Sequence, residues 1–96
     1  MTRVVWLKDA LDDLRGIGQF IAKDNPPAAR RVVSKIRDDV SLLCDHPETG
    51  RHGRVDGTRE LVIVQFPYIV AYRHVAGDVH ILAVVHTSRR WPEQLP

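Results

Sequence analysis

The sequence predicts an α+β fold in which an N-terminal helical hairpin packs on a small curved antiparallel β-sheet, in the order β-α-α-β-β-β. Two amphipathic helical stripes in the first half, a proline-containing break between them and three apolar β-type segments in the second half lead to this prediction. The chain has 96 residues, of which 44% are hydrophobic. This supports one small core, so we expect a single domain over residues 1–96.

The first half contains a short strand at residues 3–7 and two helices. The first helix is expected over about 8–22, with an apolar stripe made of Ala10, Leu14, Ile17 and Ile21. Asn25 can cap a second helix, and Pro26 suits its first position, where the missing N–H has no partner to lose. The second helix is expected to reach about Cys44. Its stripe consists of Ala29, Val33, Ile36, Val40 and Leu43.

The second half predicts three strands, over about 58–64, 68–75 and 79–85. Ala76-Gly77-Asp78 has the composition of a hairpin turn between the last two. The glycine-containing polar segment 47–57 before them is expected to be a mobile loop. The runs 69–71 and 81–85 are apolar at consecutive positions, which indicates strands covered on both faces, by helices on one side and by a partner on the other.

Arginine dominates the basic residues, supplying 11 of the 14. Its planar guanidinium suits the recognition of phosphates and carboxylates. The arginines at 51, 54 and 59 precede the strand-rich block, and Arg89 and Arg90 follow it. We expect the sheet to bring them into one basic rim that binds an anionic partner. Trp91, in a polar tail, is expected to be exposed and to take part in an interface.

Other chemistry receives little support from the residue pattern. The single cysteine, Cys44, excludes an intrachain disulfide. The five histidines lack the spacing of a metal site, so neither a metal nor another cofactor is expected. Segment 50–54 lacks the known phosphate-loop motifs. No signal peptide or membrane-spanning run is recognisable, so we expect a cytoplasmic protein without membrane contact.

Acid–base catalysis remains open. Glu60 and His86 stand near the ends of predicted strands, and with Arg59 or Arg89 they could transfer protons and stabilise charge in RNA cleavage. The simpler interpretation, which we favour, is that Arg59 and Glu60 form an exposed strand pair and that His86 ends a strand.

Three stretches of the second half carry a family pattern. They read Gly50-Arg51-x-Gly53-Arg54-Val55-x-Gly57-Thr58-Arg59-Glu60-Leu61-Val62-Ile63, Phe66-Pro67-Tyr68-Ile69-Val70-Ala71-Tyr72-Arg73 and Ile81-Leu82-x-Val84-x-His86-x-x-Arg89-Arg90-Trp91-Pro92. This pattern resembles the RelE/ParE toxin superfamily, and most closely its ParE branch. The resemblance implies a type II toxin that forms a hetero-oligomer with a cognate ParD-like antitoxin. ParE-like members block DNA gyrase, whereas RelE-like members cut mRNA at the ribosome.

The resemblance also separates the two branches. RelE-like nucleases carry basic residues where this chain has the apolar runs 68–70 and 84–85, and a C-terminal Tyr or His-Tyr where Trp91-Pro92 stands here. It therefore favours a non-catalytic gyrase inhibitor. The alternative is a ribosome-dependent mRNA endonuclease that uses Glu60, His86, Arg59 and Arg89, and direct nucleic-acid binding stays open.

The expected functional residues fall into two sets. The target-binding set comprises Arg51, Arg54, Arg59, His86, Arg89, Arg90 and Trp91. The antitoxin-binding set lies on one flank of the helical hairpin and comprises Leu14, Ile17, Ile21, Val33 and Ile36. The same helical stripes are also the simplest candidates for the core.

Overall fold

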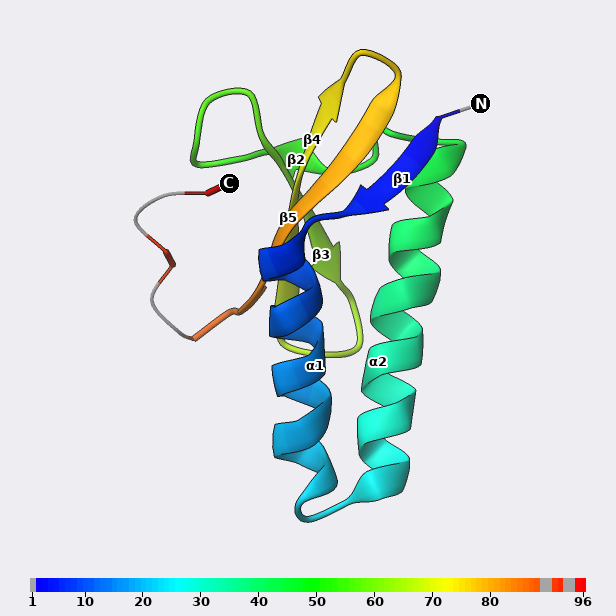
Figure 1. The fold of residues 1–96 in the computed structure, drawn as a ribbon, viewed down its shortest axis with the longest axis vertical. Helices are drawn as coiled ribbons and strands as arrows, with labels where there is room; N and C mark the ends of the chain where they lie inside the picture. The colour runs from blue at the N-terminus through cyan, green and yellow to red at the C-terminus, as the bar shows by residue number, and fades with distance from the viewer. Residues whose placement is uncertain (1, 89–90, 93–94) are drawn as a thin grey trace.

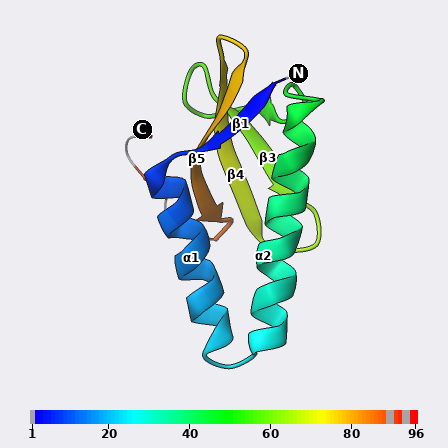
Figure 2. The same ribbon diagram turned by 45° about the vertical axis from the view of Figure 1, so that its right-hand side comes forward.

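Two helices lie side by side on one face of a five-stranded sheet (Figures 1 and 2). The computed structural model describes residues 2–88, 91–92 and 95–96. The helices are α1 (Lys8–Ala22) and α2 (Pro26–Ser41), and a 3₁₀ turn (Leu42–Cys44) follows α2. The strands are β1 (Arg3–Trp6), β2 (Arg51–His52), β3 (Arg59–Ile63), β4 (Tyr68–Val75) and β5 (Asp78–His86). The predicted α+β class with a helical hairpin is confirmed.

The sheet is mixed, with strand order β1-β5-β4-β3-β2. Neighbours β2 to β5 run antiparallel, as predicted, but β1 pairs parallel with β5. A parallel pair needs a long crossover connection, and the helical hairpin provides one here. The expectation of a wholly antiparallel sheet is therefore corrected at one edge. A second correction is the short strand β2, which forms within the segment predicted to be a loop.

The predicted cap and proline lie at the start of α2, and the predicted turn joins β4 to β5. The Asn25 side chain accepts a hydrogen bond from the Ala28 N–H (3.1 Å), and prolines occupy the first positions of α2. The predicted end of this helix at Cys44 is three residues too late, because the last turn tightens into the 3₁₀ form. In the β4–β5 hairpin, Ala76 and Gly77 both have positive φ angles, 50° and 83°. This is the geometry of a two-residue hairpin turn.

The main core lies between the helices and the sheet. Leu14 of α1, Ile36 of α2 and Tyr72 of β4 are at most 2% exposed in this layer. Val32 is buried in place of the predicted Val33, which is half-buried beside α1. A Cβ at Gly18 would come within 3.2 Å of Val33, so this glycine marks the close approach of the two helices.

A β-bulge in β5 creates a second, smaller apolar face. The register shifts between Ala71 and Tyr72 of β4, so that Leu82 is the extra residue of β5. Leu82 and Ala83 then both face away from the helices, where they join Ala71 and Val85. Three partly buried residues from outside these strands pack against this face: Leu7, Trp91 and Leu95. The bulge therefore explains part of the run of consecutive apolar residues in β5, which the sequence predicts to be covered on both faces.

Candidate functional site

The segment before β3 is held in place by a tyrosine of β4. The buried Tyr72 hydroxyl accepts a hydrogen bond from the Gly50 N–H (2.8 Å) and donates one to the Pro47 carbonyl (2.7 Å). Burial raises the pKa of this hydroxyl, so it remains a donor at neutral pH. A side chain at Gly50 would not fit, because its Cβ would lie 2.7 Å from the Tyr72 ring. The segment 47–57, expected to be a mobile loop, is therefore tied to the sheet at Pro47 and at Gly50.

Glu60 gathers two arginines on the sheet face opposite the helices. Its side chain is 4% exposed. Oε1 accepts hydrogen bonds from Nε and Nη2 of Arg51 (3.1 and 2.9 Å), and Oε2 accepts one from the Arg54 backbone N–H (3.0 Å). The Arg54 Nε lies 3.5 Å from Oε2. Glu60 is therefore the anchor that fixes both arginines relative to the sheet.

The same contacts decide the ionisation of Glu60. Burial by itself raises the pKa of this carboxyl, but hydrogen bonds from Arg54 and Arg51 and the charges of both arginines outweigh burial, so the pKa is lowered. Glu60 is thus ionised at neutral pH, with its oxygens already engaged. Such a carboxylate is a poor general base.

Trp91 of the C-terminal tail completes this cluster. The Arg54 guanidinium carbon lies 3.8 Å from the centroid of a Trp91 ring, which is a cation–π contact. Trp91 also packs against the small apolar face of β4 and β5. The guanidinium groups of Arg51 and Arg54 stay accessible, with side chains 57% and 53% exposed. We call Arg51, Arg54, Glu60 and Trp91 the arginine cluster.

The structure brings only part of the predicted target-binding set together. Arg59 pairs with Tyr72 in the β3–β4 register, so it faces the helix side, and its guanidinium donates to the Gly50 carbonyl (2.8 Å). The expected exposed pair of Arg59 and Glu60 is wrong, because neighbouring strand residues point to opposite faces. Arg89 and Arg90 lie outside the described residues.

His86 also lies away from the arginine cluster. It is paired with Tyr68 at the end of β5, and the two rings meet edge to face at 5.3 Å between centroids. Its Nδ1 accepts a hydrogen bond from the Ser88 N–H (3.1 Å). Tyr68 belongs to the helix-side core, whereas Glu60 is paired with Ala71 on the other face. The Cα atoms of Glu60 and His86 are separated by roughly 14 Å, from the strand spacing and rise. The structure does not bring the two candidate proton carriers together.

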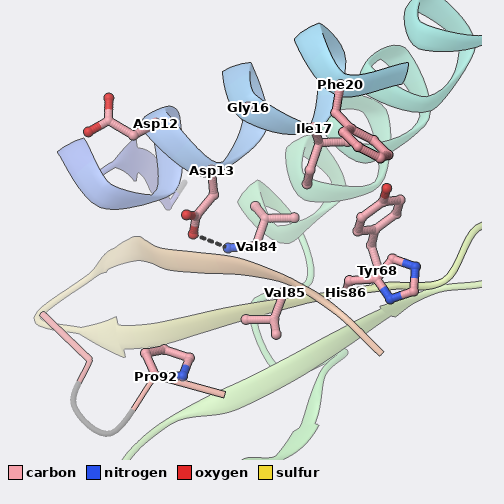
Figure 3. A pocket seen from close by; sticks show the side chains of 10 residues that line it. All are labelled: Asp12, Asp13, Gly16, Ile17, Phe20, Tyr68, Val84, Val85, His86 and Pro92. Carbon is pink, nitrogen blue, oxygen red and sulfur yellow. Dashed lines mark hydrogen bonds between the residues drawn. The ribbon is translucent and has the colours of Figure 1, made fainter. Parts of the chain in front are cut away.

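A pocket of about 540 Å³ lies between α1 and the end of β5 (Figure 3). The Asp13 carboxylate of α1 accepts a hydrogen bond from the Val84 N–H of β5 (2.9 Å). Burial raises the pKa of Asp13, and the hydrogen bond from Val84 only partly offsets this. Asp13 was not among the residues predicted to be functional. Its position, three residues after Ala10 and four before Ile17, places it beside the apolar stripe, and this was the available signal.

We predict that Asp13→Asn is at least as stable as the wild type at pH 7, with a gain of no more than about 1 kcal/mol. The reason is that burial penalises the ionised carboxylate, while an amide oxygen can still accept from Val84. A carboxyl whose pKa is raised by folding contributes stability below its ordinary pKa and loses it as the pH rises through the raised value. The advantage of the variant should therefore vanish near pH 3. Urea unfolding at pH 3, 5 and 7 measures the difference in the free energy of unfolding between the variant and the wild type. A difference that favours the variant more at pH 3 than at pH 7 contradicts the prediction.

The predicted antitoxin-binding set divides by burial. Leu14 and Ile36 are 2% and 0% exposed, so they form the core and leave no surface for a partner. They are corrected from contact residues to core residues. Ile17, Ile21 and Val33 are half-buried at its margin and keep some accessible surface.

The described residues contain neither a converging group of metal ligands nor a helix that could span a membrane. Within this part of the chain, no three His, Cys, Asp or Glu side chains converge as metal ligands would. None of the helices in the same part is long and apolar enough to cross a bilayer.

A helical hairpin on a small sheet is the fold that the resemblance to the RelE/ParE toxin superfamily implies. The family model for the ParE toxin of the type II toxin–antitoxin system parDE matches residues 4–91. The chain therefore belongs to the ParE toxin family of type II toxin–antitoxin systems.

Individual proteins agree with this assignment. The chain is 46% identical to the candidate toxin Y4kP of Sinorhizobium fredii, over 97% of this chain and 96% of that protein. It is 37% identical to toxin RelE2 of Caulobacter vibrioides, over 93% and 99% of the two chains. A chain of the chromosomal ParDE TA system from P. aeruginosa has the same fold, with a TM-score of 0.83 over 92% of this chain and 98% of that one, at 24% identity.

Proposed function

We propose that this toxin inhibits DNA gyrase by binding it without catalysis, and that a ParD-like antitoxin neutralises it in the cytoplasm. The arginine cluster is the observation that carries the first part. Two accessible guanidinium groups are held by a buried carboxylate and flanked by an aromatic ring. This combination of Arg and Trp is typical of the energetically dominant residues of protein interfaces.

The alternative, an mRNA endonuclease, is less well supported. Its candidate acid and base, Glu60 and His86, lie on opposite faces of the sheet, and Glu60 already binds two arginines. General acid–base catalysis needs both groups within hydrogen-bond reach of the reacting atoms. We therefore place Arg51, Arg54 and Trp91 in the target contact and keep His86, Arg59, Arg89 and Arg90 as candidates with less structural argument.

The target can be tested by inducing the chain in a bacterial host and pulse-labelling DNA and protein synthesis. We expect DNA synthesis to stop first, with induction of the DNA-damage response, filamentation and intact mRNA. Purified chain should then inhibit gyrase supercoiling in vitro. Early loss of translation with cleaved mRNA would instead establish the nuclease and refute gyrase as the target.

The antitoxin can be tested independently of the target. A type II system is expected to have a small antitoxin gene next to the toxin gene. The product of that gene should co-purify with this chain and restore growth when both are expressed. Ile17, Ile21 and Val33 are proposed contacts for it, because they combine apolar character with accessible surface at the margin of the helical hairpin. Growth arrest that persists despite co-expression would refute the proposed neutralisation by that protein.

A further inference from the structure

A small polar pocket of about 280 Å³ lies beside β2, β3 and β4. It shares no lining residue with the pocket of Figure 3. Two histidines, an arginine, a glutamate, a threonine and a glycine line it: His52, His74, Arg59, Glu48, Thr58 and Gly57. The pocket lies outside the arginine cluster, and its two histidines have no role in the target contact proposed above.

The strand register puts the three basic side chains of this pocket on one face of the sheet. His52 of β2 is paired with Arg59 of β3, and Arg59 is paired with Tyr72 of β4. His74 follows Tyr72 by two positions, so it points to the same face. Continued by two residues, the β3–β4 register sets Gly57 opposite His74, where there is no side chain to fill the space. The glycine therefore leaves an opening between the basic side chains.

Arg59 carries a positive charge that no carboxylate of the described residues pairs with. Its Nη1 donates to the carbonyls of Gly50 (2.8 Å) and Glu48 (3.3 Å), which fixes the guanidinium. Nε and Nη2 have no hydrogen-bond partner in the same part of the chain. Since no buried side-chain nitrogen there lacks a partner, these two atoms reach the surface. A fixed guanidinium with accessible donors and no counter-ion is well suited to bind a phosphate.

We infer that this pocket binds a phosphate group, which accepts hydrogen bonds from Nε and Nη2 of Arg59 and from the imidazoles of His52 and His74. An imidazole donates one N–H when it is neutral and two when it is protonated, so both histidines serve as donors at neutral pH. Both are exposed, so a ligand can reach them. The inference goes beyond the proposed function, because this pocket and the arginine cluster lie on opposite faces of the sheet.

The charges around the pocket favour an anion over a cation. No three metal-ligating side chains converge in the described part of the chain, and Arg59 would repel a metal ion. Glu48 is the carboxylate of the lining, and its side chain is exposed. Its charge opposes an anion in the pocket, so Glu48→Gln should tighten the binding of phosphate. The same substitution would weaken the binding of a cation, so its sign distinguishes the two kinds of ligand.

His52→Glu is the variant that tests the site most directly. It places a carboxylate opposite Arg59, where it supplies the missing counter-ion and competes with the phosphate. His80→Glu is the matched control, because His80 is also paired with an arginine of the neighbouring strand, Arg73. His80 and Arg73 each lie one position from a residue of the helix-side core, so they point to the other face. Thermal unfolding must show that both variants remain folded.

The experiment titrates the full chain with inorganic phosphate at constant ionic strength, with chloride as the balancing anion. Binding is followed by the NMR signals of the Arg59 Nε–H and of the His74 imidazole. We expect saturable shifts in the wild type, affinity at least about tenfold weaker in His52→Glu, and affinity within about twofold of wild type in His80→Glu. Glu48→Gln should bind about two- to threefold more tightly, as expected for removal of an exposed like charge.

A second arm identifies the source of the phosphate by repeating the titration with a nucleoside monophosphate and with a short DNA duplex. If the duplex shifts the same signals and His52→Glu weakens this effect, the phosphate belongs to a nucleic acid backbone. If only inorganic phosphate and the monophosphate do so, the pocket binds a free phosphate group. The inference is overturned if none of the three probes gives saturable shifts, or if chloride alone reproduces them. Equal affinities of His52→Glu and His80→Glu also overturn it, and Arg59 then only holds the backbone at Gly50.

Discussion

Replacing Ile36 with aspartate is expected to unfold the protein. Ile36 is 0% exposed at the centre of the layer between α2 and the sheet. The substitution loses the packing of a buried isoleucine, which costs about 2–5 kcal/mol, and adds an unpaired buried carboxylate, which costs several kcal/mol more. A domain of this size has a total stability of roughly 5–15 kcal/mol. The combined cost is therefore comparable with the whole free energy of unfolding.

Two substitutions on the same helix serve as controls for this effect. Ser34→Asp adds the same charge at an exposed position of α2 and should change stability by less than about 0.5 kcal/mol. Ile36→Val keeps the position apolar and should cost about 0.5–1.5 kcal/mol. Urea unfolding followed by circular dichroism distinguishes the three variants. A cooperatively folded Ile36→Asp protein would show that the helical stripe does not form the core.

The elements that could be predicted are those fixed by local chemistry. Asn25 and Pro26 determine where α2 begins, because one satisfies an N–H and the other has none to satisfy. The β4–β5 turn likewise follows from Gly77 and its neighbours. These signals act within a few residues, so the sequence contains them directly.

The parts that could not be predicted depend on contacts between distant residues. The parallel pairing of β1 with β5 joins residues about 75 positions apart, such as Arg3 and Asp78. The positions of Pro47, Gly50 and Tyr72 in the chain do not reveal that the Tyr72 hydroxyl is hydrogen-bonded to the backbone of both Gly50 and Pro47. The glycine content of this segment predicts a mobile loop, but composition does not reveal which residues contact each glycine. Gly50 is in fact required by the close approach of the Tyr72 ring.

The sequence predicted which residue types form the candidate site, but not the sheet face on which each of them lies. The arginines at 51, 54 and 59 were identified, yet Arg59 faces the helix side because it is one position away from Glu60. The register also assigns Glu60 to Arg51, its direct neighbour on β2. Side-chain direction alternates along a strand, so a shift of one position moves an arginine to the other face of the sheet. This explains why a charge cluster in the sequence divides between two surfaces in the fold.

Arg54→Gln is expected to reduce toxicity at least about tenfold, measured as the inducer concentration that halts growth and as the concentration that inhibits gyrase supercoiling. The Arg54 guanidinium is accessible and stacks on Trp91, so the substitution removes a cation from the proposed contact surface. Stability should change little, because the Glu60 carboxylate still accepts the backbone N–H at position 54 and the bonds from Arg51. Binding of the antitoxin should also be retained.

Arg37→Gln provides a matched control, because Arg37 is another exposed arginine near a tryptophan, 5.9 Å from the centroid of a Trp6 ring, but on α2. It removes the same charge and the same type of contact on the opposite side of the sheet. Toxicity should therefore be unchanged in this variant. Combining Arg54→Gln with Trp91→Ala tests whether the two residues act together, in which case the double variant loses less than the sum of the single losses. Equal toxicity of the Arg54 and Arg37 variants would show that general positive charge, and not the arginine cluster, determines binding to the target.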